Sequence, residues 1–179
     1  MNLLFLDLEM NQPSGKIIQV GWTIGDPVTG RSYAIEGSYV HIFEDLNPII
    51  SNLCGIQQDV LVNSPVLIDV YKQMLADTQK YDCQSQVVTW GGNDVSILYK
   101  QIEHYVRNNS TTWGFSRNVI DCKNIYQSWK LKQQNPHLKG GLARALTKFK
   151  LNFQGRKHNA RDDAYNTFKM YSRLLQEFK

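Results

Sequence analysis

Hydrophobic and polar positions alternate over the first forty residues in the way that is typical of β-strands. Between Leu3 and Glu9 the even-numbered leucines share one side of the chain, and Phe5, Asp7 and Glu9 share the other. Segments 16–24 and 31–42 are rich in β-branched and apolar residues, and the turn residues of 26–30 separate them. We predict three strands over 3–9, 16–24 and 31–42, with the last two paired as a hairpin.

The rest of the chain alternates strand and helix patterns. QVVTW over 86–90 predicts a short buried strand closed by two glycines, and 118–120 predicts another. Apolar residues at helical spacing follow a start signal at Ser64-Pro65 and another at 93–94, and Asn47-Pro48 starts a shorter helical segment ending near Gly55. Further helices are expected over 122–130, 141–149 and 161–178. This order predicts a single α/β domain over 1–179, with a mixed five-stranded sheet flanked by helices.

Composition narrows the class of protein. With 42% hydrophobic residues among 179, the chain has enough apolar material for a packed core, which excludes a fully disordered chain. No apolar run approaches the length of a membrane span, and the N-terminus lacks the basic stretch of a signal peptide. Three widely spaced cysteines indicate reduced thiols. We therefore expect a cytoplasmic protein without membrane association.

The formal net charge of +4 conceals an uneven distribution along the chain. Residues 1–99 carry 4 basic and 11 acidic side chains, whereas residues 100–161 carry 13 basic and 2 acidic ones. A basic block of this size is typical of a nucleic-acid-binding surface, although a lysine-rich solvated surface would give the same count.

Two acidic residues interrupt the first predicted strand. Asp7 and Glu9 are two positions apart, so they lie on one face, about 6–7 Å apart along the strand. Like charges on a half-buried face repel each other, and a divalent cation with carboxylate ligands would offset that repulsion. A strand end that faces water is the structural alternative.

Three more candidates follow later strands. Asp94 comes after QVVTW and a glycine turn, where it is either an ordinary helix cap or a ligand at the sheet edge. His158 and Asp163 stand in RKHNARDDAYNT at the start of the last helix. A histidine beside a metal-bound water can act as general base, although a lone loop histidine is more often plain surface. For Asp162 we expect a solvated partner of the helix dipole.

Together these motifs resemble the DEDDh branch of the DnaQ-like 3′–5′ exonucleases. The family's D-x-E strand is matched by Asp7-Leu8-Glu9, its second motif by Asp94, and its H-x-A-x-x-D motif by His158, Ala160 and Asp163. IIQVG over 17–21 is similar to the family's IIxIG, and Cys54-Gly55-Ile56 is similar to TGI with cysteine in place of threonine. GLARAL and DDAYNT resemble the subgroup of KapD and the enhanced-RNAi exonucleases.

The resemblance implies a ribonuclease H-like fold, two divalent cations (Mg²⁺ or Mn²⁺) and a single-stranded RNA or DNA 3′ end as substrate. It assigns the metals to Asp7, Glu9, Asp94 and Asp163, and it makes His158 the base that activates the attacking water. The similarity to this subgroup favours RNA over DNA as the expected substrate. A binding or scaffold module with the same fold and little catalysis is the alternative, and nothing in the sequence identifies a protein partner.

The resemblance also places substrate contacts near the site. Gly55 and Ile56 would lie beside the terminal nucleotide, and Met10 and Asn11 follow the D-x-E motif closely enough to contact the same sugar or base. For Met10 core packing is an equal alternative, and for Asn11 a turn is. Trp90 and Phe115 are candidates for stacking on a base, with core packing favoured for both.

Overall fold

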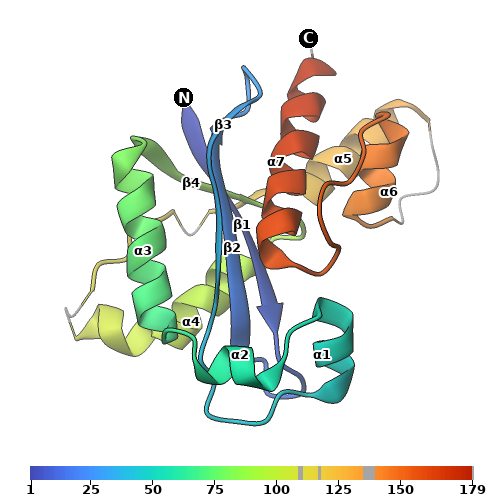
Figure 1. Ribbon diagram of the computed structural model, residues 1–179. Coiled ribbons are helices and arrows are strands. Elements are labelled where there is room, and N and C mark those ends of the chain that lie inside the picture. The colour runs from blue at the N-terminus through green and yellow to red at the C-terminus, as the bar shows by residue number, and fades with distance from the viewer. Residues whose placement is uncertain (109–110, 117, 135–139, 179) are drawn as a thin grey trace.

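The computed structural model describes residues 1–108, 111–116, 118–134 and 140–178. A five-stranded sheet with the order β3-β2-β1-β4-β5 runs through its centre (Figure 1). β2 and β3 extend it as an antiparallel hairpin on one side of β1, and β4 and β5 run parallel to β1 on the other side. The sheet is therefore mixed and five-stranded, as predicted. In chain order the elements are β1 (Asn2–Met10), β2 (Ile17–Asp26), β3 (Arg31–Tyr39), α1 (Pro48–Cys54), α2 (Gln58–Val62), α3 (Leu67–Lys80), β4 (Cys83–Thr89), α4 (Asp94–Arg107), β5 (Ile120–Asp121), α5 (Cys122–Lys132), α6 (Leu142–Lys148) and α7 (Ala160–Gln176).

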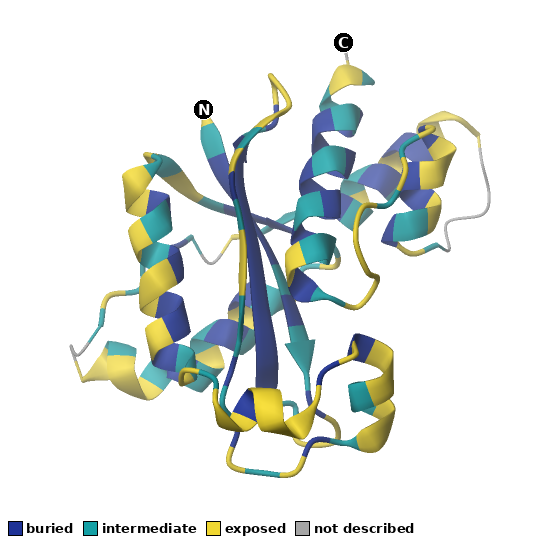
Figure 2. Ribbon diagram, viewed as in Figure 1, coloured by how far each residue is buried: buried dark blue, intermediate teal, exposed yellow. Residues whose placement is uncertain are grey.

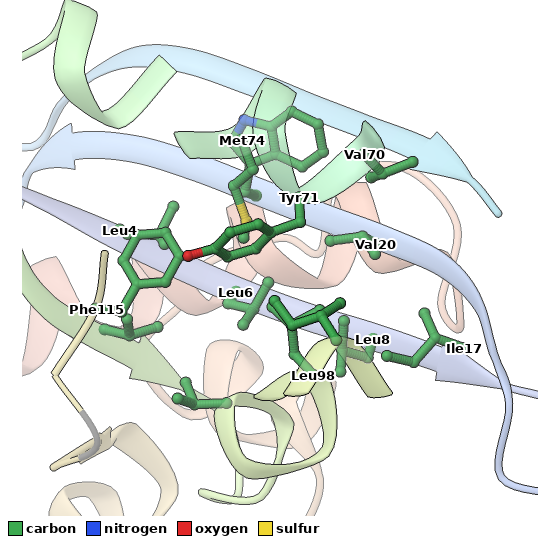
Figure 3. Packing of buried hydrophobic residues seen from close by; sticks show 14 of the residues in the cluster. Leu4, Leu6, Leu8, Ile17, Val20, Val70, Tyr71, Met74, Leu98 and Phe115 are labelled. Carbon is green, nitrogen blue, oxygen red and sulfur yellow. The ribbon is translucent and has the colours of Figure 1, made fainter. Parts of the chain in front are cut away.

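Helices cover both faces of the sheet, and each face has its own apolar cluster (Figures 1 and 2). Leu4, Leu6 and Leu8 of β1 point toward α3 and α4, where Figure 3 shows them with Tyr71 and Met74. Phe5 points to the opposite face, where its ring meets that of Phe168 of α7 edge to face, with 5.1 Å between the ring centroids. The strand alternation thus assigns Asp7 and Glu9 to the α7 face.

A third, smaller cluster closes the end of the sheet near α1 and α2. Ile18 of β2 is fully buried there with Cys54 and Ile56, which follow one another around the end of α1. Asn47 caps α1 by accepting a hydrogen bond from the Ile49 N–H at 2.8 Å, and Gly55 ends the helix with φ +68°. Within the described ranges no helix is both long and apolar enough to cross a bilayer.

Several predicted boundaries differ from the structure. The third strand ends at Tyr39 rather than Ile42, because the His41 N–H bonds to the Pro65 carbonyl and draws the chain away from β2. The helix predicted from Ser64 begins at Leu67, since the Ser64 hydroxyl donates back to Val60. The helix α2 was not predicted, because it is a single short turn of five residues.

Candidate active site

Asp7 and Glu9 occupy the last part of β1, on the α7 face. Their antiparallel neighbours in β2 are Gly21 opposite Asp7 and Gln19 opposite Glu9. Both neighbours belong to the sequence IIQVG. The first helical turn of α7 rests on this part of β2, so the strand register determines which α7 residues come close to the two acids.

Gly21 and Gln19 form the seat for α7. A Cβ atom at position 21 would lie 2.0 Å from the Ala160 carbonyl carbon, so only glycine allows the helix to approach the strand this closely. The buried Gln19 side chain accepts a hydrogen bond from the Ala160 N–H at 3.0 Å. This contact satisfies one of the free N–H groups at the start of the helix.

The loop before α7 presents His158 to the acids. His158 has φ +60°, and its backbone N–H donates to Oδ2 of Asp163 at 2.8 Å. Possible ligand atoms of Glu9, His158 and Asp163 all lie within 4.8 Å of one another. The structure therefore brings together three residues from two elements that are about 150 positions apart in the sequence.

Asp94 completes the acidic group from another direction. It is the first residue of α4, and the preceding Asn93 makes no side-chain cap. Burial raises the pKa of Asp94 to about 6, and the charge of Glu9 adds to this, while hydrogen bonds from backbone groups of Asp94 itself and of Leu8 oppose it. The first residue of α4 is thus partly buried and electrostatically coupled to Glu9 of β1.

Burial raises the pKa of the other acids too. For Asp7, the negative charges of Asp94, Asp163 and Glu9 add to the effect and hold the pKa well above its usual range. The pKa of Asp163 is raised to about 6 by burial and by Glu9. The pKa of Glu9 is raised by burial, against the hydrogen bond from Cys54. Four partly or fully buried carboxylates, three of whose pKa values are raised further by neighbouring negative charge, form a group that a cation would stabilise.

A cavity of about 400 Å³ opens onto this group. Asp7, Glu9, His158 and Asp163 lie on one side of it, and the start of α6 forms another side. Trp90 lines the cavity and is half-buried. It packs against the apolar cluster that contains Phe5 and Phe168, so it combines core packing with access to the site. The remaining lining residues are Leu8, Gly141, Leu142, Ala143, Phe153 and Lys157.

The predicted substrate residues do not line this cavity. Met10 packs against the apolar cluster that Leu4, Leu6 and Leu8 form with helices α3 and α4. Asn11 is buried, and its side chain bonds to Glu44 and to backbone groups of Asp45 and Asn47. These contacts favour the packing and turn interpretations.

The other predicted contacts lie near the site but are screened from it. Ile56 is 1% exposed within the α1–α2 cluster, and Gly55 lies under the Arg156 guanidinium. Phe115 is buried against Tyr71 on the opposite side of the sheet, so core packing explains it.

Several residues make contacts at the site that the sequence did not predict. Sγ of Cys54 donates to Oε2 of Glu9 at 3.2 Å, so the cysteine contacts an acid of the site. Asp162 lies in the first turn of α7, where an acid interacts favourably with the helix dipole, and it also accepts a hydrogen bond from the Arg156 N–H at 2.7 Å, which fixes the loop. The Gly-Arg pair at 155–156 was the available signal, since a glycine before a motif loop often marks a constrained backbone.

The basic block has mixed roles in the structure. Lys157 lines the cavity. Lys130 is buried with its ammonium 5.5 Å from the Tyr126 ring centre, and Arg161 donates to the Ile35 carbonyl at 3.2 Å. Positions 109–110, 117 and 135–139 of the block lie outside the described residues. Part of the positive charge therefore stabilises the protein itself.

The fold is similar to those of solved nucleases. Cell-death related nuclease 4 superposes with a TM-score of 0.82 at 19% identity, over 98% of this chain and 64% of that one. The nuclease domain of 3′hExo, a DEDDh family member bound to rAMP, gives 0.71 at 18% identity, over 98% and 92%. Pop2p of S. pombe, in a form with bound Mg²⁺ and Mn²⁺, gives 0.69 at 15% identity, over 98% and 83%.

These likenesses show that the chain has the α/β, ribonuclease H-like fold that the resemblance implied. This chain spans slightly less than two thirds of cell-death related nuclease 4. No protein-family model matches the sequence, and no curated protein matches it.

Proposed function

We propose that this protein is a metal-dependent 3′–5′ exonuclease that removes nucleoside monophosphates from a single-stranded 3′ end. The observation that carries the proposal is the convergence of Glu9, His158 and Asp163, with ligand atoms within 4.8 Å of one another, beside a cavity that Asp7 also lines. The sequence predicted these residues from motifs, and the fold supports their assignment.

The donor set fits hard divalent cations. Asp7, Glu9, Asp94 and Asp163 supply carboxylate oxygens, the ligands that Mg²⁺ prefers and that Mn²⁺ accepts. Burial raises the pKa values of Asp7 and Asp163, and the negative charges of neighbouring acids raise them further, so a bound cation would stabilise the ionised forms. Two such cations, when bound, would acidify a water and stabilise the attacking and leaving oxygens of phosphodiester hydrolysis.

His158 has the part of general base in this proposal. Its side chain is exposed at the cavity, where an imidazole nitrogen can accept a proton from the attacking water. Its backbone N–H donates a hydrogen bond to Asp163, and this bond fixes the main chain that carries the imidazole ring. Asp163 thus serves both as a metal ligand and as the anchor of the base.

RNA is the favoured substrate. The support is the resemblance to the KapD and enhanced-RNAi subgroup and the rAMP bound to 3′hExo. The cavity, at about 400 Å³, suits one nucleotide, and Lys157 gives it a positive edge. The reduced thiols fit a cytoplasmic enzyme.

The direct test uses 5′-labelled single-stranded RNA and DNA of one sequence, with Mg²⁺, Mn²⁺ or EDTA. We expect a ladder shortening from the 3′ end, nucleoside 5′-monophosphate as product, faster cleavage of RNA, and no cleavage in EDTA. Asp7→Asn, which keeps the shape of the side chain, should abolish cleavage. Cleavage that the variant retains in full would contradict the metal assignment.

A binding or scaffold module without catalysis is the second candidate function. Four of the five motif residues line one cavity, and the fifth, Asp94, is electrostatically coupled to Asp7 and Glu9, which argues against this candidate. Metal-linked stabilisation separates the two candidates, because a ligand of the folded state raises the melting temperature. A melting temperature that Mn²⁺ leaves unchanged, together with oligonucleotide binding and no cleavage, would favour the module.

A further inference from the structure

The Arg156 side chain connects two segments that are about a hundred residues apart in the sequence. Arg156 lies in the loop before α7, and its Nη2 donates to the carbonyl oxygens of Asn52 at 3.2 Å and of Leu53 at 3.3 Å. Both carbonyls belong to the last turn of α1, where helix geometry leaves them without an internal partner. A guanidinium group has enough donors in one plane to bond to both.

Gly55 leaves room for this connection. Its φ of +68° ends α1 in the left-handed region, and a Cβ atom built there would lie 1.4 Å from Nη1 of Arg156. The guanidinium therefore occupies the volume that any other side chain at this position would fill. Backbone conformation and the contact with Arg156 each require glycine here.

The backbone of Arg156 is held as firmly as its side chain. Its N–H donates to Oδ2 of Asp162 at 2.7 Å, and two residues later the His158 N–H donates to Oδ2 of Asp163. Gly155 has φ +78°, and a Cβ there would lie 2.2 Å from Asp162 Oδ2. The loop is thus fixed to the first turn of α7, and Arg156 extends from it to α1.

A further contact connects α1 with Glu9 of the proposed site. Cys54, the last residue of α1, donates to Oε2 of Glu9, and Glu9 lies with His158 in the proposed metal group. A closed path of contacts therefore runs from His158 through Arg156, α1 and Cys54 back to Glu9. In Figure 1 the end of β1 lies close to both α1 and the start of α7, and the Arg156 hydrogen bonds connect α1 with the loop before α7.

We infer that Arg156 is a positioning residue, which fixes the α1 turn and the His158 loop relative to each other and so keeps His158 and Glu9 aligned for the reaction. Both Asn52 and Leu53 carbonyls engage its guanidinium, so its charge is directed at the protein and not at a substrate phosphate. This inference rests on the proposed exonuclease function. It adds a role for a residue outside the motifs that carry the resemblance.

The test measures kcat, KM and the salt dependence of oligonucleotide binding for Arg156→Ala. A misalignment of roughly 1 Å costs about 100-fold in rate, so we expect kcat to fall by about 10- to 100-fold. KM and the slope of log affinity against log salt should stay as in the wild type. Arg156→Lys, which can reach one carbonyl, should recover part of kcat.

Lys157→Ala is the matched contrast, since it removes the same charge from the next residue, which lines the cavity. We expect this variant to raise KM and to reduce the salt slope by about one, as the loss of one phosphate contact does. If Arg156→Ala showed that pattern instead, or kept the wild-type kcat, the positioning role would be wrong.

A double-mutant cycle tests the link to α1. Gly55→Ala should displace the guanidinium and lower kcat, and adding it to Arg156→Ala should cost less than it does alone, since only the strain of alanine at φ +68° is then left. Amide hydrogen exchange gives a readout that does not depend on activity. The Gly55 N–H bonds to the Ser51 carbonyl at 2.7 Å, and its exchange should accelerate in Arg156→Ala.

These readouts separate the two proposals. A wild-type protein that cleaves neither RNA nor DNA would overturn the exonuclease function, and with it the role in alignment. Unchanged exchange at Gly55 in Arg156→Ala would overturn the contact between the loop and α1 even in an active enzyme.

Discussion

The backbone N–H of His158 donates to Oδ2 of Asp163 at 2.8 Å, so a proposed metal ligand holds the proposed base in place through its main chain. The contact leaves the imidazole itself free to face the cavity. It also stabilises His158 at φ +60°, a conformation that residues other than glycine seldom adopt. The spacing of the H-x-A-x-x-D motif therefore has a local physical cause.

Replacement of His158 should separate catalysis from metal binding. We choose His158→Asn, because asparagine tolerates positive φ better than alanine and so keeps the loop in place. Loss of a general base typically costs about 10²- to 10⁴-fold, and we expect kcat to fall within that range. Stopped assays on labelled RNA give kcat, and Mn²⁺ should still raise the melting temperature. A variant with wild-type kcat would show that His158 is not the base.

Gly21→Ala should displace α7 from the sheet. The added Cβ would lie about 2 Å from backbone atoms of Ala160 and Arg161, which cannot move aside as a side-chain end can. Overpacking of this kind typically costs about 1–3 kcal/mol and sometimes more. Urea unfolding should show this loss in the free energy of unfolding. The cleavage rate of the folded protein should also fall, because Asp163 moves with α7.

Gly30→Asn is the control for Gly21→Ala. Gly30 has φ +72° in the β2–β3 turn, and a Cβ there meets nothing within 4 Å. Asparagine suits that conformation, so stability and cleavage should change little. Equal losses in the two variants would contradict the role of Gly21 as the seat of α7.

Strand periodicity is local, so the sequence was sufficient to place Asp7 and Glu9 on one face of the first strand. Alternation alone assigned Asp7 and Glu9 to the face opposite Leu4, Leu6 and Leu8, and the structure confirms this. All five strands were predicted from the pattern of residues, with shifted boundaries, and their order along the chain predicted a mixed sheet. The motif spacing then gave His158 and Asp163, which the structure brings to Glu9.

The contacts that hold the site together were not predictable in the same way. The bond from Arg156 to α1 and the bond from Cys54 to Glu9 join segments remote in sequence, and neither leaves a periodic signal. Gln19 is an ordinary polar residue in a strand until α7 is placed over it. Such contacts depend on tertiary packing, which a single sequence does not display.

Without metal, the carboxylates should make stability depend on pH. The pKa of Asp94 in the folded state is about 6, against an ordinary value of 3.8, so the folded protein binds this proton more tightly than the unfolded chain does. The resulting stabilisation is complete below about pH 4 and is lost as pH rises through about 6. Asp163 has a pKa of about 6 and the same sign.

The measurement compares melting temperatures of the wild type and Asp94→Asn in EDTA from pH 4 to 7.5. Because other groups titrate in this range, the difference between the two proteins is the informative quantity, and the variant should gain relative stability as pH rises. Added Mn²⁺ should stabilise the wild type more at pH 7.5 than at pH 5, since protons compete with the metal. A pH-independent difference would contradict the raised pKa.

Cys54 should be chemically inert in the folded protein, although it contacts Glu9. The residue is 2% exposed, and burial together with the Glu9 charge raises the pKa of its thiol to about 12. The thiolate is the reactive form, and at pH 8 such a group is ionised in roughly one molecule in ten thousand. Iodoacetamide should therefore leave Cys54 unmodified in the native state and alkylate it in guanidinium chloride, as peptide mass mapping would show. Native labelling as fast as in the unfolded chain would mean that the α1 turn opens readily, and the Cys54–Glu9 contact would then be too short-lived to position the acid.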